Sequence, residues 1–353
     1  MKYVPIGSRR VGDGEPCYVI AEAGSNHCGS LDQARQLIDV AAASGADAVK
    51  FQVFRASRLY PKTAGVSGYL KDPTPIFDVI AAMEIPYNWI PKLADHCIRR
   101  GVDFLASAFD EESTDQIAPY VPVFKIASYE MTHAPLVRHT AHFGKPVIVS
   151  TGTADLAEVA ATVRLFGEPL TAGLVLMQCT AAYPAPLDSM NVRAIVTMRE
   201  RFGIPVGLSD HSADPVIAPV AAVACGAAVI EKHFTLSHAL PGPDHRFALE
   251  PDQLLRMVSA IRDAERALGT GEKTVAPIEQ ELRAFARRSL FAVRDIATGE
   301  LLTDENVAVL RNGQHAAGLP PDQLGSVLGR PAARAIPADS LLAREDVGKA
   351  GDC

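Results

Sequence analysis

Eight short apolar runs recur along the chain, and each is bounded by turn residues and followed by a helical pattern. Runs of this length that are rich in Val, Ile and Phe are typical of β-strands covered on both faces. Eight strand–helix alternations over roughly 250 residues predict an α/β fold of the (β/α)8 TIM-barrel type, whereas six or seven would favour a doubly wound open sheet. The expected strands are residues 18–24, 48–54, 103–109, 123–128, 147–152, 174–180, 206–212 and 229–235.

The pattern also predicts where the barrel ends and a second domain begins. A final helix over 251–268 closes a barrel domain that we place at 1–269, with a charged linker at 270–288. The remaining residues, 289–353, contain two similar stretches 40 residues apart, Arg-x-Ile-x4-Leu-Leu-x2-Glu-[Asn/Asp]-Val. Two copies indicate a small domain with internal pseudo-twofold symmetry, because a solenoid needs at least three repeats.

Helical patterns at 31–44, 91–100 and 155–166 fill connections between the expected strands. Asp155, followed by Glu158 three residues later, indicates a capping box at the start of the third helix. The connection from Arg55 to Trp89 is too long for a simple strand-to-helix loop. Long loops of this kind shape the active site in many barrels.

Charge and cysteine usage exclude several classes of protein. The 353 residues carry 34 Lys and Arg against 41 Asp and Glu, a net charge of −7, which offers no general attraction for nucleic acid or an anionic membrane. Six scattered cysteines without a CxxC pair fit a reducing compartment. The N-terminus lacks a signal-peptide core, and the most apolar stretch, 216–230, is shorter than the ~20 residues of a membrane span. We therefore expect a soluble cytoplasmic protein.

Functional side chains stand at the carboxyl ends of the expected strands. Positions i and i+2 of a strand share a face, so the pairs Lys50/Gln52, Ser209/His211 and Glu231/His233 can each point into one mouth. Two lysines beside hydroxyl residues favour a phosphate or carboxylate site, although a strand-end lysine can also be a surface residue or half of a salt bridge. The serines can equally be caps or turn residues. The other strand-end residues are Glu22, Ser107, Lys125, Ser128 and Ser150.

Two histidines and two carboxylates suggest further chemistry in this mouth. His211 and His233 end neighbouring strands and could bind one divalent metal ion, with open positions for water and substrate, although a lone histidine at such a place is usually structural. Glu22 and Glu130 are the carboxylates best placed for proton transfer or water activation. A second interpretation of Glu130 is nearly as good: it lies in the first turn of a helix, where the helix macrodipole stabilises a negative charge.

The strand ends, taken as an ordered set, resemble the sialic acid synthase family, the phosphoenolpyruvate-dependent nonulosonate synthases. Residues 289–311 are similar to the antifreeze-like (SAF, β-clip) domain that follows the barrel in these enzymes, so the resemblance covers nearly the whole chain. No single stretch would be specific alone. The matching stretches are IAEAGSNHCGS (20–30), ADAVKFQ (46–52), FKIASYE (124–130), VSTGT (149–153), CTAAYP (179–184), VGLSDHS (206–212), IEKHFTL (230–236) and GPDHRFALEP (242–251).

The resemblance implies that phosphoenolpyruvate condenses with an open-chain N-acylated amino sugar to give a nine-carbon 2-keto-3-deoxy acid and phosphate. It implies Mn²⁺ or Mg²⁺ on the two histidines, an anion site made by the lysines and serines, and Glu130 as the residue that activates water. It further implies a domain-swapped homodimer in which Arg311 of one chain reaches the partner's sugar, with Phe285 nearby. Gln52, Tyr183 and Asp244 match positions that contact the sugar or support the metal's water ligands.

Three departures from the family pattern concern the ligands. Ala181 stands where family members often have an asparagine near the phosphate. Asn312 replaces the proline of an Arg-Pro-Gly loop in the small domain. The excursion from Arg55 to Trp89 has no clean match to the sugar-binding loop of the neuraminate enzymes. Some stretches lean toward pseudaminate synthases and others toward neuraminate or legionaminate synthases. A related sugar-phosphate synthase and a non-enzymatic sugar-binding protein are the alternatives.

Overall fold

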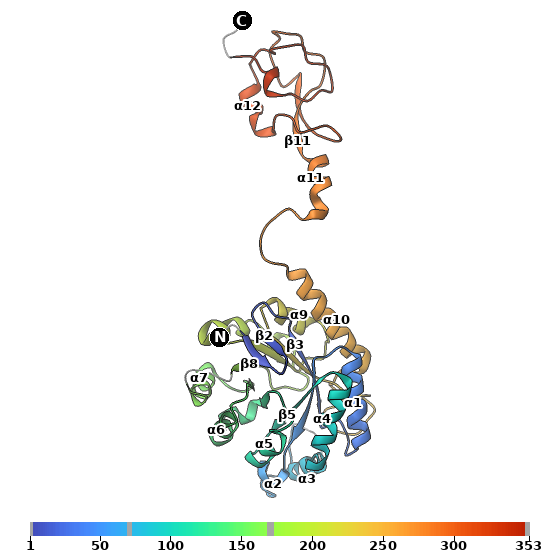
Figure 1. Cartoon of the computed structure of the whole chain (residues 1–353), viewed down its shortest axis with the longest axis vertical. Coiled ribbons are helices and arrows are strands. Elements are labelled where there is room, and N and C mark those ends of the chain that lie inside the picture. The colour runs from blue at the N-terminus through green and yellow to red at the C-terminus, as the bar shows by residue number, and fades with distance from the viewer. Residues whose placement is uncertain (1–2, 69–72, 168–172, 350–353) are drawn as a thin grey trace. The chain divides into compact units, whose positions relative to one another are not determined.

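A closed barrel of eight parallel strands forms the first part of the protein, in the order β10-β3-β4-β5-β6-β7-β8-β9 (Figure 1). The computed structural model describes residues 3–68, 73–167 and 173–349 and divides the chain into two compact units, Met1–Gly269 and Thr270–Cys353. The predicted (β/α)8 barrel is confirmed, because each expected run contains one barrel strand. These strands are β3 (Tyr18–Gly24), β4 (Ala48–Val53), β5 (Asp103–Ala108), β6 (Phe124–Ile126), β7 (Val147–Ser150), β8 (Leu174–Cys179), β9 (Val206–Asp210) and β10 (Val229–His233).

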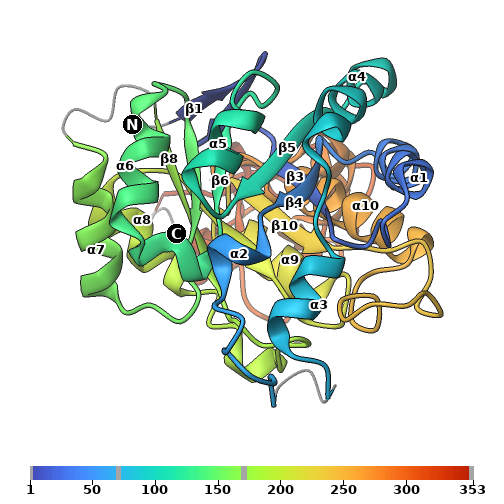
Figure 2. The same cartoon turned by 90° about the horizontal axis from the view of Figure 1, so that it is seen from below.

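Helices follow the strands and cover the outside of the barrel (Figure 2). The capping box at the third predicted helix is present, with the Asp155 side chain accepting from the backbone N–H of Ala157 and Glu158. Among the described residues, no helix is long and apolar enough to cross a membrane. The covering helices are α1 (Leu31–Ala43), α4 (Ile90–Arg100), α5 (Glu111–Ile117), α6 (Ala134–His142), α7 (Leu156–Leu165), α8 (Ala194–Phe202), α9 (Ile217–Ala224) and α10 (Pro251–Leu268).

Two regions contain structure that the sequence patterns did not predict. The N-terminus forms a hairpin of β1 (Tyr3–Ile6) and β2 (Arg9–Gly12), whose buried Val4, Ile6 and Val11 join the apolar cluster inside the barrel. The long excursion after β4 contains α2 (Ala56–Leu59), α3 (Ile76–Ala82) and the 3-10 turn η1 (Tyr87–Trp89). These two short helices lie next to each other (Figures 1 and 2).

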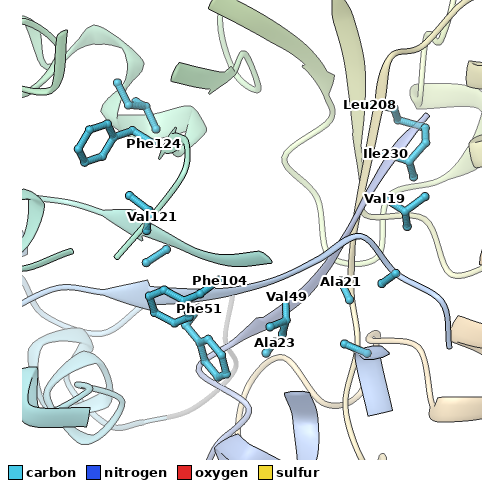
Figure 3. Close-up of a cluster of buried hydrophobic side chains, with 14 of the residues drawn as sticks. Val19, Ala21, Ala23, Val49, Phe51, Phe104, Val121, Phe124, Leu208 and Ile230 are labelled. Atoms are coloured by element: carbon cyan, nitrogen blue, oxygen red, sulfur yellow. The ribbon is translucent and has the colours of Figure 1, made fainter. Parts of the chain in front are cut away.

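The barrel has two apolar layers because successive strand residues face opposite sides. Side chains that point outward, such as Val19, Val49 and Ile230, pack in the larger cluster beneath the helices (Figure 3). Side chains that point inward, such as Ile20 and Leu105, fill the barrel itself. Two residues further along β3 and β5, the same inward face carries Glu22 and Ser107, so one strand supplies both core and site.

A buried ion pair joins the last two strands of the barrel. The ammonium of Lys232 on β10 pairs with the carboxylate of Asp210 on β9, and both side chains are almost completely buried. The same ammonium donates to the carbonyl of Ser212 over 2.6 Å. Burial lowers the pKa of Lys232, although the Asp210 carboxylate opposes this change. The pair therefore depends on both partners being present.

The second unit contains the region expected to be a plain linker together with the small domain. The 3-10 turn η4 (Pro277–Glu279) and α11 (Gln280–Ala286) lie within residues 270–288, the expected linker. The domain itself has β11 (Arg288–Ala292), β12 (Val307–Arg311), η5 (Pro321–Gln323), α12 (Leu324–Val327) and η6 (Arg344–Asp346).

The two repeated stretches of this domain have matching roles. Ile296 of the first forms a bridge with Ile336 of the second. The side chain of Asn306 accepts from the backbone N–H of Thr303, as the side chain of Asp346 accepts from that of Ala343. Residues 40 positions apart thus stabilise equivalent turns.

The Lys232–Asp210 pair generates a prediction about stability. Lys232→Met leaves the Asp210 carboxylate buried and unpaired, so we expect the free energy of unfolding to fall by about 3–5 kcal/mol. Urea unfolding followed by circular dichroism measures this change. Lys273→Met, at an exposed position of the second unit, is the control. A loss below about 1 kcal/mol in the Lys232 variant would contradict the interpretation.

Candidate active site

A cavity of about 460 Å³ lies at the carboxyl ends of the barrel strands. Its volume falls within the range of small-molecule sites. The cavity brings together residues that lie up to 225 positions apart, from Glu22 to Phe247. The predicted site residues that line the cavity are Glu22, Lys50, Gln52, Ser107, Lys125, Ser128, Ser150, Tyr183, Ser209, His211, His233 and Asp244.

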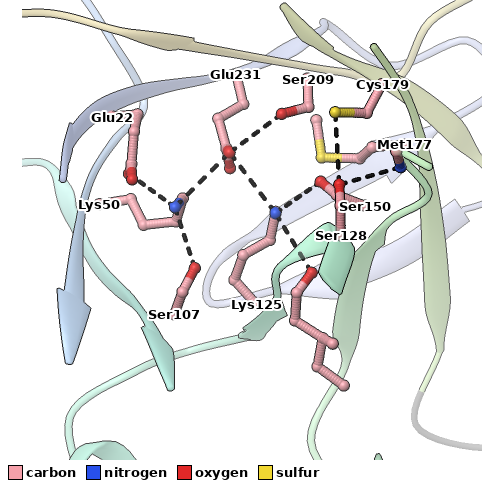
Figure 4. Close-up of polar contacts among 12 residues, drawn as sticks. Glu22, Lys50, Ser107, Lys125, Ser128, Ser150, Met177, Cys179, Ser209 and Glu231 are labelled. Atoms are coloured by element: carbon pink, nitrogen blue, oxygen red, sulfur yellow. Dashed lines mark hydrogen bonds and ion pairs between the residues drawn. The ribbon is translucent and has the colours of Figure 1, made fainter. Parts of the chain in front are cut away.

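Two lysines and two glutamates form a continuous buried ionic chain across the cavity floor (Figure 4). The Lys50 Nζ lies 2.7 Å from Glu22 Oε2 and 3.6 Å from Glu231 Oε1. The Lys125 Nζ lies 3.6 Å from the same Glu231 oxygen. Buried charges need partners, so Glu231 holds two ammonium groups at one end of the cavity.

The four charged groups of this chain differ in how they hold protons. Burial lowers the pKa of Lys125, whereas for Lys50 the neighbouring Glu22 and Glu231 outweigh burial and raise the pKa. Burial raises the pKa of Glu22. Burial acts in the same direction on Glu231, but the two lysines outweigh it and lower the pKa. Of the two carboxyl groups, Glu22 is therefore the one that more readily holds a proton, while Glu231 stays ionised.

Hydroxyl groups surround the two ammonium groups. Lys50 donates to Ser107 Oγ over 3.1 Å, and Lys125 donates to Ser150 Oγ over 2.7 Å. The Ser128 Oγ accepts from the backbone N–H of Gly152 over 3.0 Å. The hydroxyl of Ser209 lies 3.4 Å from Glu231 Oε1. Ammonium and hydroxyl donors that converge in this way suit an anion with several oxygens.

The two histidines lie side by side above the ionic chain, with ring centroids 5.5 Å apart. The Nδ1 of His211 lies 2.8 Å from the carbonyl of Thr180, which leaves Nε2 as the nitrogen with a free lone pair. The Nδ1 of His233 is buried without a hydrogen-bond partner and lies 3.9 Å from Asp244 Oδ2. Burial, then the nearby His211, lowers the pKa of His233 well below its usual value. Burial acts to lower the pKa of His211, but the contacts with Cys179 and the Thr180 carbonyl outweigh it and raise the pKa. The neutral imidazole of His233 suits a metal ion.

The described residues hold no group of three or more His, Cys, Asp or Glu side chains arranged to bind a metal. A metal on His211 and His233 would therefore take its remaining ligands from water and substrate. Aromatic rings complete this part of the cavity, with the Tyr183 ring 4.2 Å from that of His211 and the Phe247 ring 5.3 Å from that of His233.

Three predicted site residues lie outside the described cavity lining. Glu130 is in the first turn of the 3-10 helix η2 (Ser128–Thr132), and its neighbour Tyr129 lines the cavity instead. Burial raises the pKa of Glu130 to about 7, and one of its carboxyl oxygens has no hydrogen-bond partner. Phe285 on α11 and Arg311 at the end of β12 belong to the second unit, and both are exposed.

Other residues of the site were not among the predicted ones. Glu231 links the two lysines. Strand parity paired it with His233 in the sequence but no role was assigned to it, although the same parity indicates that its side chain points into the cavity. Arg246 and Phe247 line the cavity next to Asp244; both lie in the stretch 242–251 that resembles the family, but neither was given a role. Ala181 also lines the cavity, so the substitution noted in the sequence does face the ligand space.

Comparisons with known proteins agree with this geometry. The family model described as "NeuB family" matches residues 37–273, and the SAF domain model matches residues 287–348. The chain is 42% identical to the spore coat polysaccharide biosynthesis protein SpsE of Bacillus subtilis over 97% of this chain and 96% of that protein. The crystal structure of that protein superimposes with a TM-score of 0.67 and 41% identity, over 99% of both chains.

Two further relatives have names that state a product. The N,N'-diacetyllegionaminic acid synthase of Legionella pneumophila is 37% identical over 97% of each chain. The pseudaminic acid synthase of Campylobacter jejuni is 36% identical over 93% of this chain and 96% of that one. The barrel, its ionic chain and these matches lead to one conclusion: the chain belongs to the NeuB family of nonulosonate synthases and carries a SAF domain after its barrel.

Proposed function

We propose that this protein condenses phosphoenolpyruvate with the open-chain form of an N-acylated amino sugar. The C3 carbon of phosphoenolpyruvate bonds to the aldehyde carbon, water adds at C2, and the C–O bond to phosphate breaks. The products are a nine-carbon 2-keto-3-deoxy acid and inorganic phosphate. The observation that carries this proposal is the pair Lys50 and Lys125, held by one carboxylate and surrounded by serine hydroxyls.

The floor of the cavity supplies what phosphoenolpyruvate needs. Its phosphate and carboxylate are both anions, and two ammonium groups with Ser107, Ser128 and Ser150 nearby provide donors for each. When the anion binds, Lys50 and Lys125 exchange part of their contact with Glu231 for contact with substrate. Glu22 and Glu231, the carboxylates of the ionic chain, also reduce the positive charge around the bound anion. The product phosphate is therefore held less tightly and can leave.

The acceptor is better matched by a neutral sugar than by a sugar phosphate. Beyond Lys50 and Lys125, Arg246 is the one Lys or Arg among the described lining residues. A second phosphate group would need a second basic cluster. Gln52, Tyr183 and Asp244 instead offer amide, phenol and carboxylate groups that suit sugar hydroxyls.

Two carboxyl groups handle protons in this proposal. Glu22 accepts a 3.0 Å hydrogen bond from Gln52, and its raised pKa lets it deliver a proton to the oxygen of the former aldehyde. Glu130, with a pKa of about 7, is the candidate for activating water near neutral pH. It lies one residue from Tyr129, which lines the cavity, so a small movement of η2 is required for direct contact.

His211 and His233 would hold the divalent ion, Mn²⁺ or Mg²⁺, that the family resemblance implies. The unpartnered Nδ1 of His233 and the nearby Asp244 carboxylate fit this role. When bound, such an ion would polarise the aldehyde and stabilise negative charge on its oxygen. The protein's part is to orient the imidazoles, as the Thr180 carbonyl does for His211, and to keep His233 neutral by burying it.

We further propose a domain-swapped homodimer in the cytoplasm. Ile278, Leu282 and Phe285 recur at helical spacing along the segment that joins barrel and SAF domain, and they are 91%, 65% and 50% exposed. An apolar helix face of this kind favours burial against a second copy. Arg311 of one chain would then reach the sugar of the other. The five described cysteines are free thiols, in keeping with a reducing compartment.

The proposed reaction predicts a product of defined mass, which mass spectrometry can measure. With Mn²⁺, phosphoenolpyruvate and an N-acylated amino sugar, we expect release of phosphate and a product whose mass equals both substrates plus water minus phosphoric acid. Arabinose 5-phosphate should give none, because the described lining residues include no second basic cluster. Lys125→Met should lower kcat/KM by at least about 100-fold, since it removes a charge-assisted contact to the anion. Phosphate release with the sugar phosphate alone would refute the proposal.

The metal site predicts a response to chelation and to histidine removal. EDTA should abolish phosphate release and Mn²⁺ should restore it. The double variant His211→Ala/His233→Ala should lose at least about 100-fold in rate and should not respond to added Mn²⁺. His142→Ala, at an exposed position of α6, is the control. Wild-type rates in the double variant would show that the two imidazoles bind no catalytic ion.

The proposed dimer predicts that one variant changes the sedimenting mass of the protein and that another changes the KM for the sugar. Leu282→Glu places a charge on the exposed apolar face, so sedimentation should show a shift toward monomer. Arg311→Ala should leave the mass unchanged and raise the KM for the sugar about tenfold or more, with the KM for phosphoenolpyruvate unaffected. A wild-type protein that sediments as a monomer at full activity would rule the dimer out.

A further inference from the structure

A cysteine and a histidine contact each other next to the cavity, but neither is among the residues that line it. Cys28, which lies between β3 and α1, is exposed, and its Sγ lies 3.3 Å from Nε2 of His245. The His245 side chain is buried, and its Nδ1 lies 2.6 Å from the hydroxyl of the equally buried Thr235. The proposed reaction uses none of these three side chains.

The hydrogen bonds of Thr235 decide which nitrogen of His245 faces the thiol with a lone pair. The Thr235 hydroxyl donates to the carbonyl of Ser237 over 3.2 Å, and it accepts from the backbone N–H of Ser237 over 3.2 Å. Because its one proton is used, its oxygen accepts from Nδ1–H of His245, which leaves the lone pair on Nε2. A thiol beside a base that a third group orients is the arrangement of an activated nucleophile.

The other described cysteines do not combine exposure with a base. Cys17 and Cys97 are buried, and burial raises the pKa of both thiols. Cys179 contacts His211 but is also buried, and Cys225 is half-buried. Among the described cysteines, Cys28 is therefore the one that a small molecule in solution reaches most easily and that a base can activate.

We propose that Cys28 is a modification site that forms a mixed disulfide with a low-molecular-weight disulfide. Nε2 of His245 takes the thiol proton, the thiolate attacks one sulfur of the small disulfide, and the new S–S bond forms as the old one breaks. The released thiolate then takes the proton, so one small thiol leaves for each adduct. A free small thiol reverses the step by attacking the mixed disulfide.

The adduct would act on the loop that joins β10 to α10. The Sγ of Cys28 lies 3.3 Å from the carbonyl oxygen of Pro241, and His245 lies in the same loop, so the thiol holds this loop at two points. A group on the sulfur needs space that the carbonyl and the imidazole now border. The loop must therefore shift, and its residues Asp244 and Phe247 line the cavity. The effect on activity rests on the proposed function, in which Asp244 contacts the sugar, whereas the reactivity of the thiol does not.

The first experiment measures thiol reactivity in the full chain. The probe is dithiobis(2-nitrobenzoic acid), a small disulfide that releases a coloured thiolate. All proteins carry Cys353→Ser, because Cys353 lies outside the described residues. We expect one fast-reacting thiol per chain, which Cys28→Ser removes and the control Cys225→Ser retains.

Two further variants show whether the base is responsible. His245→Gln and the near-isosteric Thr235→Val should each slow the fast reaction by at least about 10-fold, because they remove the base or its orientation. Thermal melting checks that each variant is folded. A fast phase that survives Cys28→Ser would overturn the proposal, and so would a wild-type rate in the folded His245 and Thr235 variants.

The second experiment uses glutathione disulfide and follows both the loop and the reaction. Peptide mass should place one glutathionyl group on Cys28, and hydrogen–deuterium exchange of residues 237–247 should become faster. With the amino sugar that the unmodified enzyme accepts, the KM for the sugar should rise about 10-fold while the KM for phosphoenolpyruvate stays the same. Dithiothreitol should restore the original values, and Cys28→Ser should keep them throughout.

The two readouts separate the proposals. An adduct that leaves both the exchange of the loop and the KM for the sugar unchanged would overturn the link between Cys28 and the cavity. An unmodified enzyme that releases no phosphate with any amino sugar would instead refute the proposed function. The rate of the thiol and the exchange of the loop would then still decide whether Cys28 is the modification site.

Discussion

The site depends on one constraint, which is that four buried charges must neutralise each other inside a closed barrel. Lys50 and Lys125 are 2% and 3% exposed, so neither ammonium could stay charged without a carboxylate in contact. Glu231 contacts both, and Glu22 contacts the first. These contacts join side chains from four strands, β3, β4, β6 and β10. The positions of the two ammonium groups therefore depend on the barrel being closed.

The same strands carry the core and the chemistry, because their side chains alternate with a period of two. Inward positions such as Ile20 and Leu105 fill the barrel, and the next inward positions, Glu22 and Ser107, enter the cavity. Outward positions pack beneath the helices and hold the strands in register. A rigid apolar layer on both sides of the backbone is what lets polar groups at the strand ends keep their positions without a ligand.

The excursion after β4 is the part of the barrel where this regular arrangement stops. Its helices are less buried than the helices around the barrel, and α3 presents an apolar face to ligand space. Fixed strand ends for the shared chemistry and a variable loop for the acceptor are a usual division of roles in barrel enzymes. In this protein the ionic chain stands on the strand ends, whereas the apolar face of α3 comes from the excursion.

The sequence by itself determined the barrel, its strand ends, the capping box at Asp155 and twelve of the fifteen predicted site residues in the cavity. Most of these follow from local patterns, because apolar runs, turn residues and period-two parity are readable within one strand, whereas Tyr183 and Asp244 were implied only by the family resemblance. Only the tertiary structure decided that Glu231 holds both lysines, that Glu130 lies behind Tyr129, and that α3 faces the cavity. Such facts depend on the register of strands and loops far apart in the chain, which no local pattern contains.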